Sequence, residues 1–254
     1  MTTLNREEYM LSHDICQVAA ATWCEYLTKY PKIQDIIPTN YIFDLSPAHL
    51  DWMRNNSQYE EFCIEVGVYD GRLILIFYPM SKEGKRIDDK EAYPFSFLCQ
   101  LDRDIRLQET QEYVIVKNAI LSKDLQNVDQ DADMSFPISG KPVLEQDKAL
   151  EAIEKWRDEG MEWFYRECNE FNGARIFRRF YVPTADLCLS DKSLNGIVCS
   201  FGLKFNDIYE RMLVTLIFIS FRDSLQNVGG VQLESNTYDW AKPCPPICRI
   251  PGFE

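Results

Sequence analysis

Apolar side chains recur every three or four residues between Leu11 and Tyr30, which is the spacing of one face of an α-helix. We expect Pro31 to end this helix, because proline pushes the residue before it out of the helical region. Ser46-Pro47 is typical of a helix start and predicts a second, short helix that ends near Asn55-Asn56.

A β-hairpin follows these helices. Two strand-like runs, Phe62 to Tyr69 and Arg72 to Met80, flank Asp70-Gly71, a pair that suits a tight hairpin turn. The second run is apolar on both faces, which indicates a central strand that is covered on both sides. Further strands are expected at Tyr93 to Leu101 and Gln111 to Leu121.

The second half of the chain repeats this order. Helical periodicity runs from Leu144 to Phe171, and Asn172-Gly173 is a natural helix stop. Three strand-like runs come next, at Ala174 to Val182, Asn195 to Phe205 and Arg211 to Phe221. A tail rich in proline and glycine completes the half.

The order of elements predicts an α+β fold made of two similar modules, each a helix with an antiparallel sheet. We place the first module at residues 1–125, a linker at 126–142, and the second module with its proline- and cysteine-containing tail at 143–254. Both modules contain a strongly apolar strand, RLILIFYPM and MLVTLIFISF, and the tetrapeptide LQNV occurs twice. The repetition raises the hypothesis of an internal duplication, which the sequence alone leaves open.

Charge narrows the range of partners. The formal net charge is −13 and the pI is near 4.7, so phosphate backbones and anionic membrane surfaces are repelled at long range. The first ten residues, MTTLNREEYM, lack the apolar core of a signal peptide, and the ten apolar residues from Met212 to Phe221 are too few to cross a bilayer. We therefore expect a cytoplasmic protein that binds neither nucleic acid nor membrane.

Nine cysteines are spread over the chain, and most are expected to be reduced, buried thiols. The most distinctive local motif is Cys244-Pro-Pro-Ile-Cys248. An extended polyproline geometry would hold the two thiols too far apart for a disulfide, although a cis proline or a turn would close the gap. Structural anchoring of the tail, a redox-active or disulfide pair, and metal ligation are the three interpretations.

Three segments of the second half are informative when they are taken together. They are GARIFRRFY at Gly173 to Tyr181, MLVTLIFIS at Met212 to Ser220, and YDWAKPCPPICR around Cys244 to Cys248. Together they resemble small uncharacterised bacterial proteins that share two strands and a terminal Cys-Pro-Pro-x-Cys. The resemblance covers about a third of the chain. It implies no activity, cofactor or ligand.

Other candidate chemistry is weaker. The acids from Asp129 to Asp133 lack the glycine and glutamate that would complete a calcium loop, so a solvated acidic linker is expected. His13 with Cys16, or His49 with a distant cysteine, could pair a base with a thiol, but a structural role is the expectation for each. Nucleophile-elbow, P-loop and dinucleotide fingerprints are absent from the sequence. The sequence therefore identifies no catalytic residue, and we expect no cofactor and no metal.

A short basic segment alternates with aromatic residues, a pattern that can bind single-stranded nucleic acid. In so acidic a chain we instead expect its arginines to pair with nearby carboxylates while alternate side chains enter the core. The arginines are Arg175, Arg178 and Arg179, and the aromatic residues are Phe177, Phe180 and Tyr181.

These observations favour a non-enzymatic protein that acts by binding another protein with a basic surface, in the manner of an immunity protein or adaptor. An enzyme of unfamiliar type is the alternative, either thiol-dependent through Cys244 or Cys248, or a hydrolase with carboxylates between the halves. A structural subunit of a larger assembly is the second alternative. The sequence does not give the oligomeric state.

Overall fold

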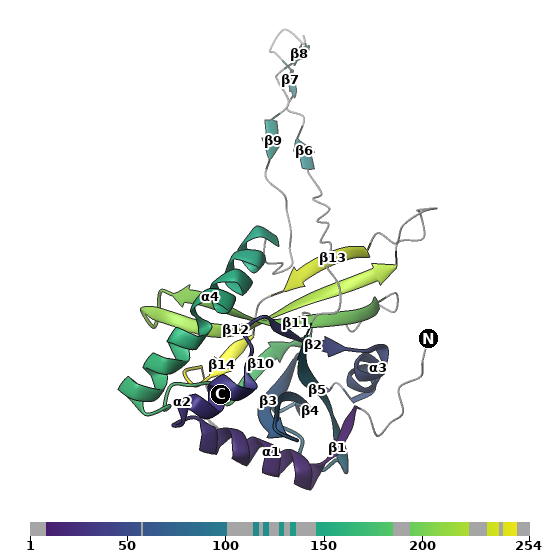
Figure 1. Cartoon of the computed structure of the whole chain (residues 1–254). Coiled ribbons are helices and arrows are strands. Elements are labelled where there is room, and N and C mark those ends of the chain that lie inside the picture. Colours follow the sequence, from purple (N-terminus) through teal and green to yellow (C-terminus); the bar gives the residue numbers. More distant parts are fainter. Residues whose placement is uncertain are drawn as a thin grey trace.

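The computed structural model describes residues 9–56, 58–100, 114–116, 119–121, 127–129, 133–135, 146–184, 194–223, 233–238 and 241–247. Within these residues, helices pack on a ten-stranded antiparallel sheet, so the expected α+β class is confirmed (Figure 1). The acidic segment from Asp129 to Asp133, the linker and both copies of LQNV lie wholly or partly outside the described residues, as does Cys248.

The elements follow the chain in two groups. The first group contains β1 (Met10–Ser12), α1 (His13–Tyr26), α2 (Tyr30–Ile36), β2 (Tyr41–Leu45), α3 (Pro47–Asn56), β3 (Glu61–Tyr69), β4 (Arg72–Pro79) and β5 (Ala92–Gln100). The second contains α4 (Gln146–Phe171), β10 (Arg179–Pro183), β11 (Leu194–Asn206), β12 (Arg211–Asp223), β13 (Leu233–Tyr238) and β14 (Lys242–Cys244).

Two short antiparallel pairs lie between these groups in the sequence, and Figure 1 shows them apart from the main sheet. They replace the single long strand expected at Gln111 to Leu121. One pair joins β6 (Val114–Val116) to β9 (Asp133–Ser135), and the other joins β7 (Ala119–Leu121) to β8 (Asn127–Asp129).

The first helix differs from the expectation. α1 ends at Tyr26, and Pro31 lies in the first turn of α2 instead of terminating a helix. Proline suits this position because its missing N–H has no partner in a first turn. The chain therefore forms two helices where the periodicity predicted one.

Several local predictions are confirmed. The β3–β4 turn has positive φ at Asp70 and Gly71, and β4 lies between β3 and β5 with nearly all of its side chains buried. α4 ends where expected, at Asn172-Gly173, both of which also have positive φ. A side chain at Gly173 would collide with the carbonyl of Leu27, so the close approach also requires glycine there.

The two groups exchange strands within the sheet. Its order is β13-β12-β11-β2-β5-β4-β3-β10-β14, with β1 paired to β5. Each group contains a three-stranded meander, β3–β5 or β11–β13, and the last strand before it in the chain is β2 or β10. β2 pairs with β5 of its own group and with β11 of the other group. β10 pairs with β14 of its own group and with β3 of the other group. The residue ranges predicted as two modules therefore share one hydrogen-bonded sheet.

The register of this exchange is the same on both sides. Ile64 in β3 lies opposite Phe180, and Cys199 in β11 lies opposite Phe43. Each of these two positions is followed three residues later by a glycine, Gly67 or Gly202. The strands β2 and β10 thus occupy matching places on the two meanders.

A helix also packs against each of these two glycines. α1 packs on β3, where Ala19 would touch a Cβ placed on Gly67, and α4 packs on β11, where Ala152 would touch one placed on Gly202. A missing side chain on the strand and a small one on the helix allow this close approach. In both helices a buried tryptophan follows the alanine four residues later, Trp23 and Trp156.

One face of the sheet carries a single hydrophobic cluster that joins both groups, and the opposite face carries two separate clusters, one beside each helix. The shared cluster takes alternate residues from the paired meander strands. They are Phe62, Ile64, Val66 and Val68 of β3, Leu73, Leu75 and Phe77 of β4, Ile197, Cys199, Phe201 and Leu203 of β11, and Val214, Leu216 and Phe218 of β12.

Candidate functional site: the tip of the β11–β12 hairpin

The cysteine motif that stood out in the sequence does not present a free Cys244 thiol. Cys244 is disulfide-bonded to a residue outside the described part of the chain, and it lies in β14 opposite Arg179. The peptide bonds before Pro245 and Pro246 are both cis, which is the alternative to an extended polyproline geometry. Because β14 pairs with β10, the described part of the motif attaches the tail to the sheet. Cys248 itself lies outside the described residues.

The histidine candidates have structural partners. His49 is buried; its Nδ1 lies 2.8 Å from the Ser46 hydroxyl and its Nε2 lies 2.8 Å from the carbonyl oxygen of Phe95. Burial lowers the pKa of His49, so the ring is held neutral between these groups. Cys16 hydrogen-bonds to Tyr78, and His13 Nε2 lies 2.7 Å from Gln17. These contacts give neither histidine a thiol partner.

A buried charge cluster lies on β3. Glu65 accepts a hydrogen bond from Arg86 at 2.6 Å and forms an ion pair with Arg179 at 3.5 Å. Burial raises the pKa of the neighbouring Cys63 to about 12, so this thiol stays protonated and unreactive. The cluster joins β3, β10 and the loop after β4, which indicates a structural role.

Two of the three arginines of the basic segment pair with carboxylates, as expected. Arg179 contacts Glu65, and Arg175 donates to both carboxylate oxygens of Glu167 at 2.6 and 2.8 Å. Phe177 and Phe180 enter the shared core. The buried carboxylates among the described residues, Glu65 and Glu167, therefore belong to arginine pairs in separate places and do not face one another as a hydrolytic pair would.

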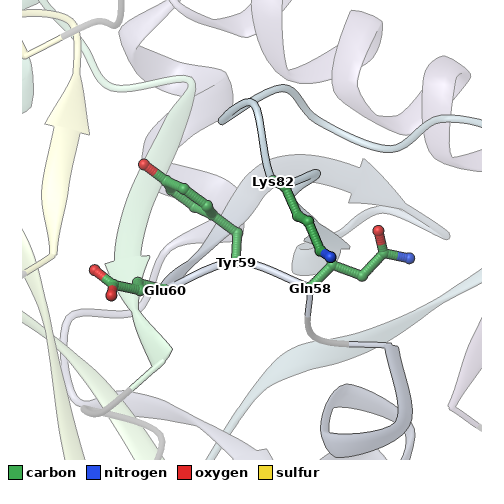
Figure 2. A pocket seen from close by; sticks show the side chains of 4 residues that line it. All are labelled: Gln58, Tyr59, Glu60 and Lys82. Carbon is green, nitrogen blue, oxygen red and sulfur yellow. The ribbon is translucent and has the colours of Figure 1, made fainter.

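An open hollow of about 410 Å³ lies beside the start of β3. It is lined by Gln58, Tyr59, Glu60 and Lys82 (Figure 2). In Figure 2 the Gln58 and Glu60 side chains point in opposite directions from their shared segment. A small-molecule site usually has polar groups that converge on an enclosed space, and this hollow lacks that arrangement.

Two further features are absent from the described residues. No cluster of three or more histidine, cysteine, aspartate or glutamate side chains is placed to hold a metal ion. None of the helices there is both long enough and apolar enough to cross a membrane.

The turn that joins β11 to β12 carries large apolar side chains in solvent. Ile208 is 85% exposed, Phe205 is 59% exposed, and Tyr209 is also exposed. Asp207 and Glu210 flank the two apolar residues of the turn. Ile208 contributes nothing to the hydrophobic core, because the strands on either side of the turn bury their own apolar residues.

The turn has a fixed shape. The side-chain oxygen of Asn206 accepts hydrogen bonds from the backbone N–H groups of Ile208 at 3.0 Å and Tyr209 at 3.1 Å. Such an Asx turn holds the loop before any ligand arrives. Next to the turn, the indole N–H of Trp163 in α4 donates to the carbonyl of Met212 at 3.1 Å. The hairpin is thereby attached to the helix.

The end of α4 contributes charge beside the turn. Arg175 stacks over the ring of Phe171, 3.2 Å from its centroid, while it binds Glu167. Arg211, the first residue of β12, is half-buried and interacts electrostatically with Arg175, Glu167 and Tyr209. Burial, together with the nearby Arg175, lowers the pKa of Arg211.

We name these residues the hairpin-tip surface: Phe205, Ile208, Tyr209 and Arg211 of the hairpin, with Phe171 of α4. Aromatic residues and arginine beside an exposed aliphatic side chain are the composition of protein–protein contact centres. The sequence predicts strands on both sides of this turn and indicates no role for the turn itself. The available signal was the pair Ile208-Tyr209 in a turn, where polar residues are usual.

Searches of protein-family models, curated proteins and solved structures find no match to this chain. The resemblance of the second half to small bacterial proteins stays a prediction.

Proposed function

We propose that this protein acts by binding another protein through the hairpin-tip surface. The observation that carries the proposal is the 85% exposure of Ile208 on a turn whose shape is fixed by Asn206. A preformed turn loses little conformational entropy on binding, and an apolar side chain at its tip can enter a pocket of the partner.

Charge defines the partner further. The net charge of −13 favours a protein with a basic surface, because complementary fields speed association and oppose acidic competitors. Asp207 and Glu210 place two acids at the contact itself. An immunity-protein or adaptor role in the cytoplasm, in which this chain covers a basic site of its partner, fits these features.

We infer also that the two groups of elements are copies of one module. The shared register of β2 and β10 on the meanders, and the alanine-on-glycine contact beneath each helix, support this duplication. A direct superposition of α1 with β3–β4 on α4 with β11–β12 tests it, and unrelated backbone paths would contradict it.

The experiment that tests the binding proposal compares two charge substitutions at exposed apolar sites. Ile208→Asp changes the hairpin tip, whereas Val18→Asp changes a 65% exposed position on α1, away from the β11–β12 hairpin. Tagged wild-type protein and both variants are used to capture partners from the native cells in a salt series. We expect one stoichiometric partner with wild type and Val18→Asp, weaker at high salt, and its loss with Ile208→Asp. Equal capture by both variants, or no capture by wild type, contradicts the proposal.

A further inference from the structure

Glu210, the last residue of the β11–β12 turn, has a backbone conformation that is unusual for glutamate. Its φ is +50°, which lies in the left-handed region. The Cβ atom of an L-residue crowds the backbone in this region, so glycine, asparagine and aspartate are the residues that usually occupy it. Glu210 therefore imposes a local cost on the fold that a more tolerant residue would remove.

The other left-handed positions of the chain contain tolerant residues. Among the described residues, the other two non-glycine residues with positive φ are Asp70 and Asn172. Each is followed by a glycine, in the β3–β4 turn and at the end of α4. A short polar side chain can hydrogen-bond to the nearby backbone, which makes aspartate and asparagine acceptable there. The hairpin tip departs from this rule.

Core packing does not explain the glutamate, because Glu210 is exposed. The turn is held by Asn206, whose side chain binds the backbone N–H groups of Ile208 and Tyr209. This fixed turn presents the Glu210 carboxylate two residues from the exposed side chain of Ile208. A strained residue that stability alone would replace, on a surface suited to binding, indicates a role in function.

Charge identifies the kind of group that this carboxylate binds. Both charged residues of the turn, Asp207 and Glu210, are acids, and the net charge of the chain is −13. A cationic side chain is therefore attracted to the turn at long range and at contact.

We infer that Glu210 binds a lysine or arginine side chain of the partner protein, next to the pocket that receives Ile208. The inference rests on the proposed protein-binding function and specifies the chemistry of the partner at this surface. The carboxylate accepts charge-assisted hydrogen bonds from the ammonium or guanidinium group. Contact around Ile208 keeps water from this ion pair, so the complex recovers the cost that Glu210 imposes on the free protein.

Three substitutions at position 210 separate the backbone cost from the charge. Glu210→Gly, Glu210→Asn and Glu210→Asp each introduce a residue that tolerates positive φ, and only Glu210→Asp keeps the carboxylate. We expect all three to raise the midpoint of thermal unfolding by about 2–4 °C. Unchanged midpoints in all three variants would overturn the inference, because Glu210 would then carry no cost for binding to explain.

The binding experiment uses the protein that tagged wild type captures from its native cells, purified as the probe. Glu210→Asp should bind it within about threefold of wild type, and Glu210→Asn and Glu210→Gly at least about tenfold more weakly. The affinity of Glu210→Asn should also depend less steeply on salt than that of Glu210→Asp, since one ion pair is missing. The matched control is Asp70→Asn, which removes an acid at positive φ from the other hairpin and should bind like wild type.

The two proposals fail in different ways. If Glu210→Asn and Glu210→Asp bind equally tightly, or if Asp70→Asn weakens binding as much as Glu210→Asn does, the role of Glu210 is overturned and the hairpin-tip surface stands. If wild type captures no partner, or if Ile208→Asp binds the probe as tightly as wild type, the proposed function and the role of Glu210 both fail. Circular dichroism of each variant separates a binding loss from a folding loss.

Discussion

The two hairpins of the sheet, β3–β4 and β11–β12, share their strands and differ in their turns. In both, an alanine of a helix lies over a glycine of the first strand, and the second strand contains the tripeptide Leu-Ile-Phe, at Leu75–Phe77 and Leu216–Phe218. The first turn is the tight, polar Asp70-Gly71, whereas the second exposes Ile208. The shared features build the core, whereas the difference between the two turns lies in solvent, where it can serve binding.

The largest expected effect on stability comes from a position where the strands differ. Glu65 and Ser200 each lie two residues before the glycine of their strand, and both are buried. Glu65→Ala leaves Arg86 and Arg179 without their shared carboxylate, so unfolding free energy should fall by about 3 kcal/mol. Ser200→Ala should cost about 1 kcal/mol or less. Urea denaturation measures both, and equal losses would contradict the structural role of the Glu65 cluster.

The two strand glycines, Gly67 and Gly202, should also differ in how much stability is lost when a side chain is added. A Cβ at Gly67 would lie 3.0 Å from the Ala19 side chain and 3.1 Å from its backbone, so α1 would have to move. A Cβ at Gly202 would meet chiefly the end of the Ile217 side chain, which can rotate. Gly67→Ala should therefore cost about 2 kcal/mol and Gly202→Ala about 1 kcal/mol. Thermal unfolding compares them, and a reversed order would show that α4 is held more rigidly than α1.

The Cys63 thiol predicts a pH dependence. Burial raises its pKa from the ordinary 9.0 to about 12, so above pH 9 the unfolded chain loses this proton before the folded chain does. Stability is unaffected below pH 9 and should fall as the pH rises above it. Denaturation between pH 8 and about 10 measures the slope, which should be smaller in Cys63→Ala. An unchanged slope in that variant would assign the effect to other groups.

The smallest expected effects on stability concern the two arginines that follow the turns, Arg72 and Arg211. Arg72→Gln removes a stacked guanidinium with an exposed ion pair and should cost about 0.5–1 kcal/mol. Arg211→Gln removes a charge that forms no ion pair among the described residues and interacts unfavourably with Arg175, so unfolding free energy should change by about 0.5 kcal/mol or less. Parallel denaturant titrations test this, and a clear loss in Arg211→Gln would mean that the chain itself already pairs with Arg211.

Local features of the fold could be predicted from the sequence, because they depend on neighbouring residues. The turn at Asp70-Gly71, the helix stop at Asn172-Gly173 and the buried strand at 72–80 all follow from backbone preference and apolar pattern. The exchange of β2 and β10 could not be predicted, since pairing of distant strands leaves no local pattern. The predicted helix end at Pro31 was wrong because proline suits the start of a helix as well as the position after its end.

The candidate site was missed for a related reason. The candidates in the sequence were Cys244, Cys248 and the histidines, because cysteine and histidine are residue types of catalysis. The exposure of Ile208 depends on where the turn lies relative to α4. This is a property of the tertiary structure.

The central claim, that the β11–β12 turn contacts a partner and the β3–β4 turn does not, is tested most directly by site-specific photo-crosslinking in the native cells. A photoreactive amino acid is placed at position 208 in one variant and at position 72 in another. The account predicts one discrete crosslinked protein from position 208 and none from position 72. Crosslinking to the same protein from both positions, or from position 72 alone, would contradict it.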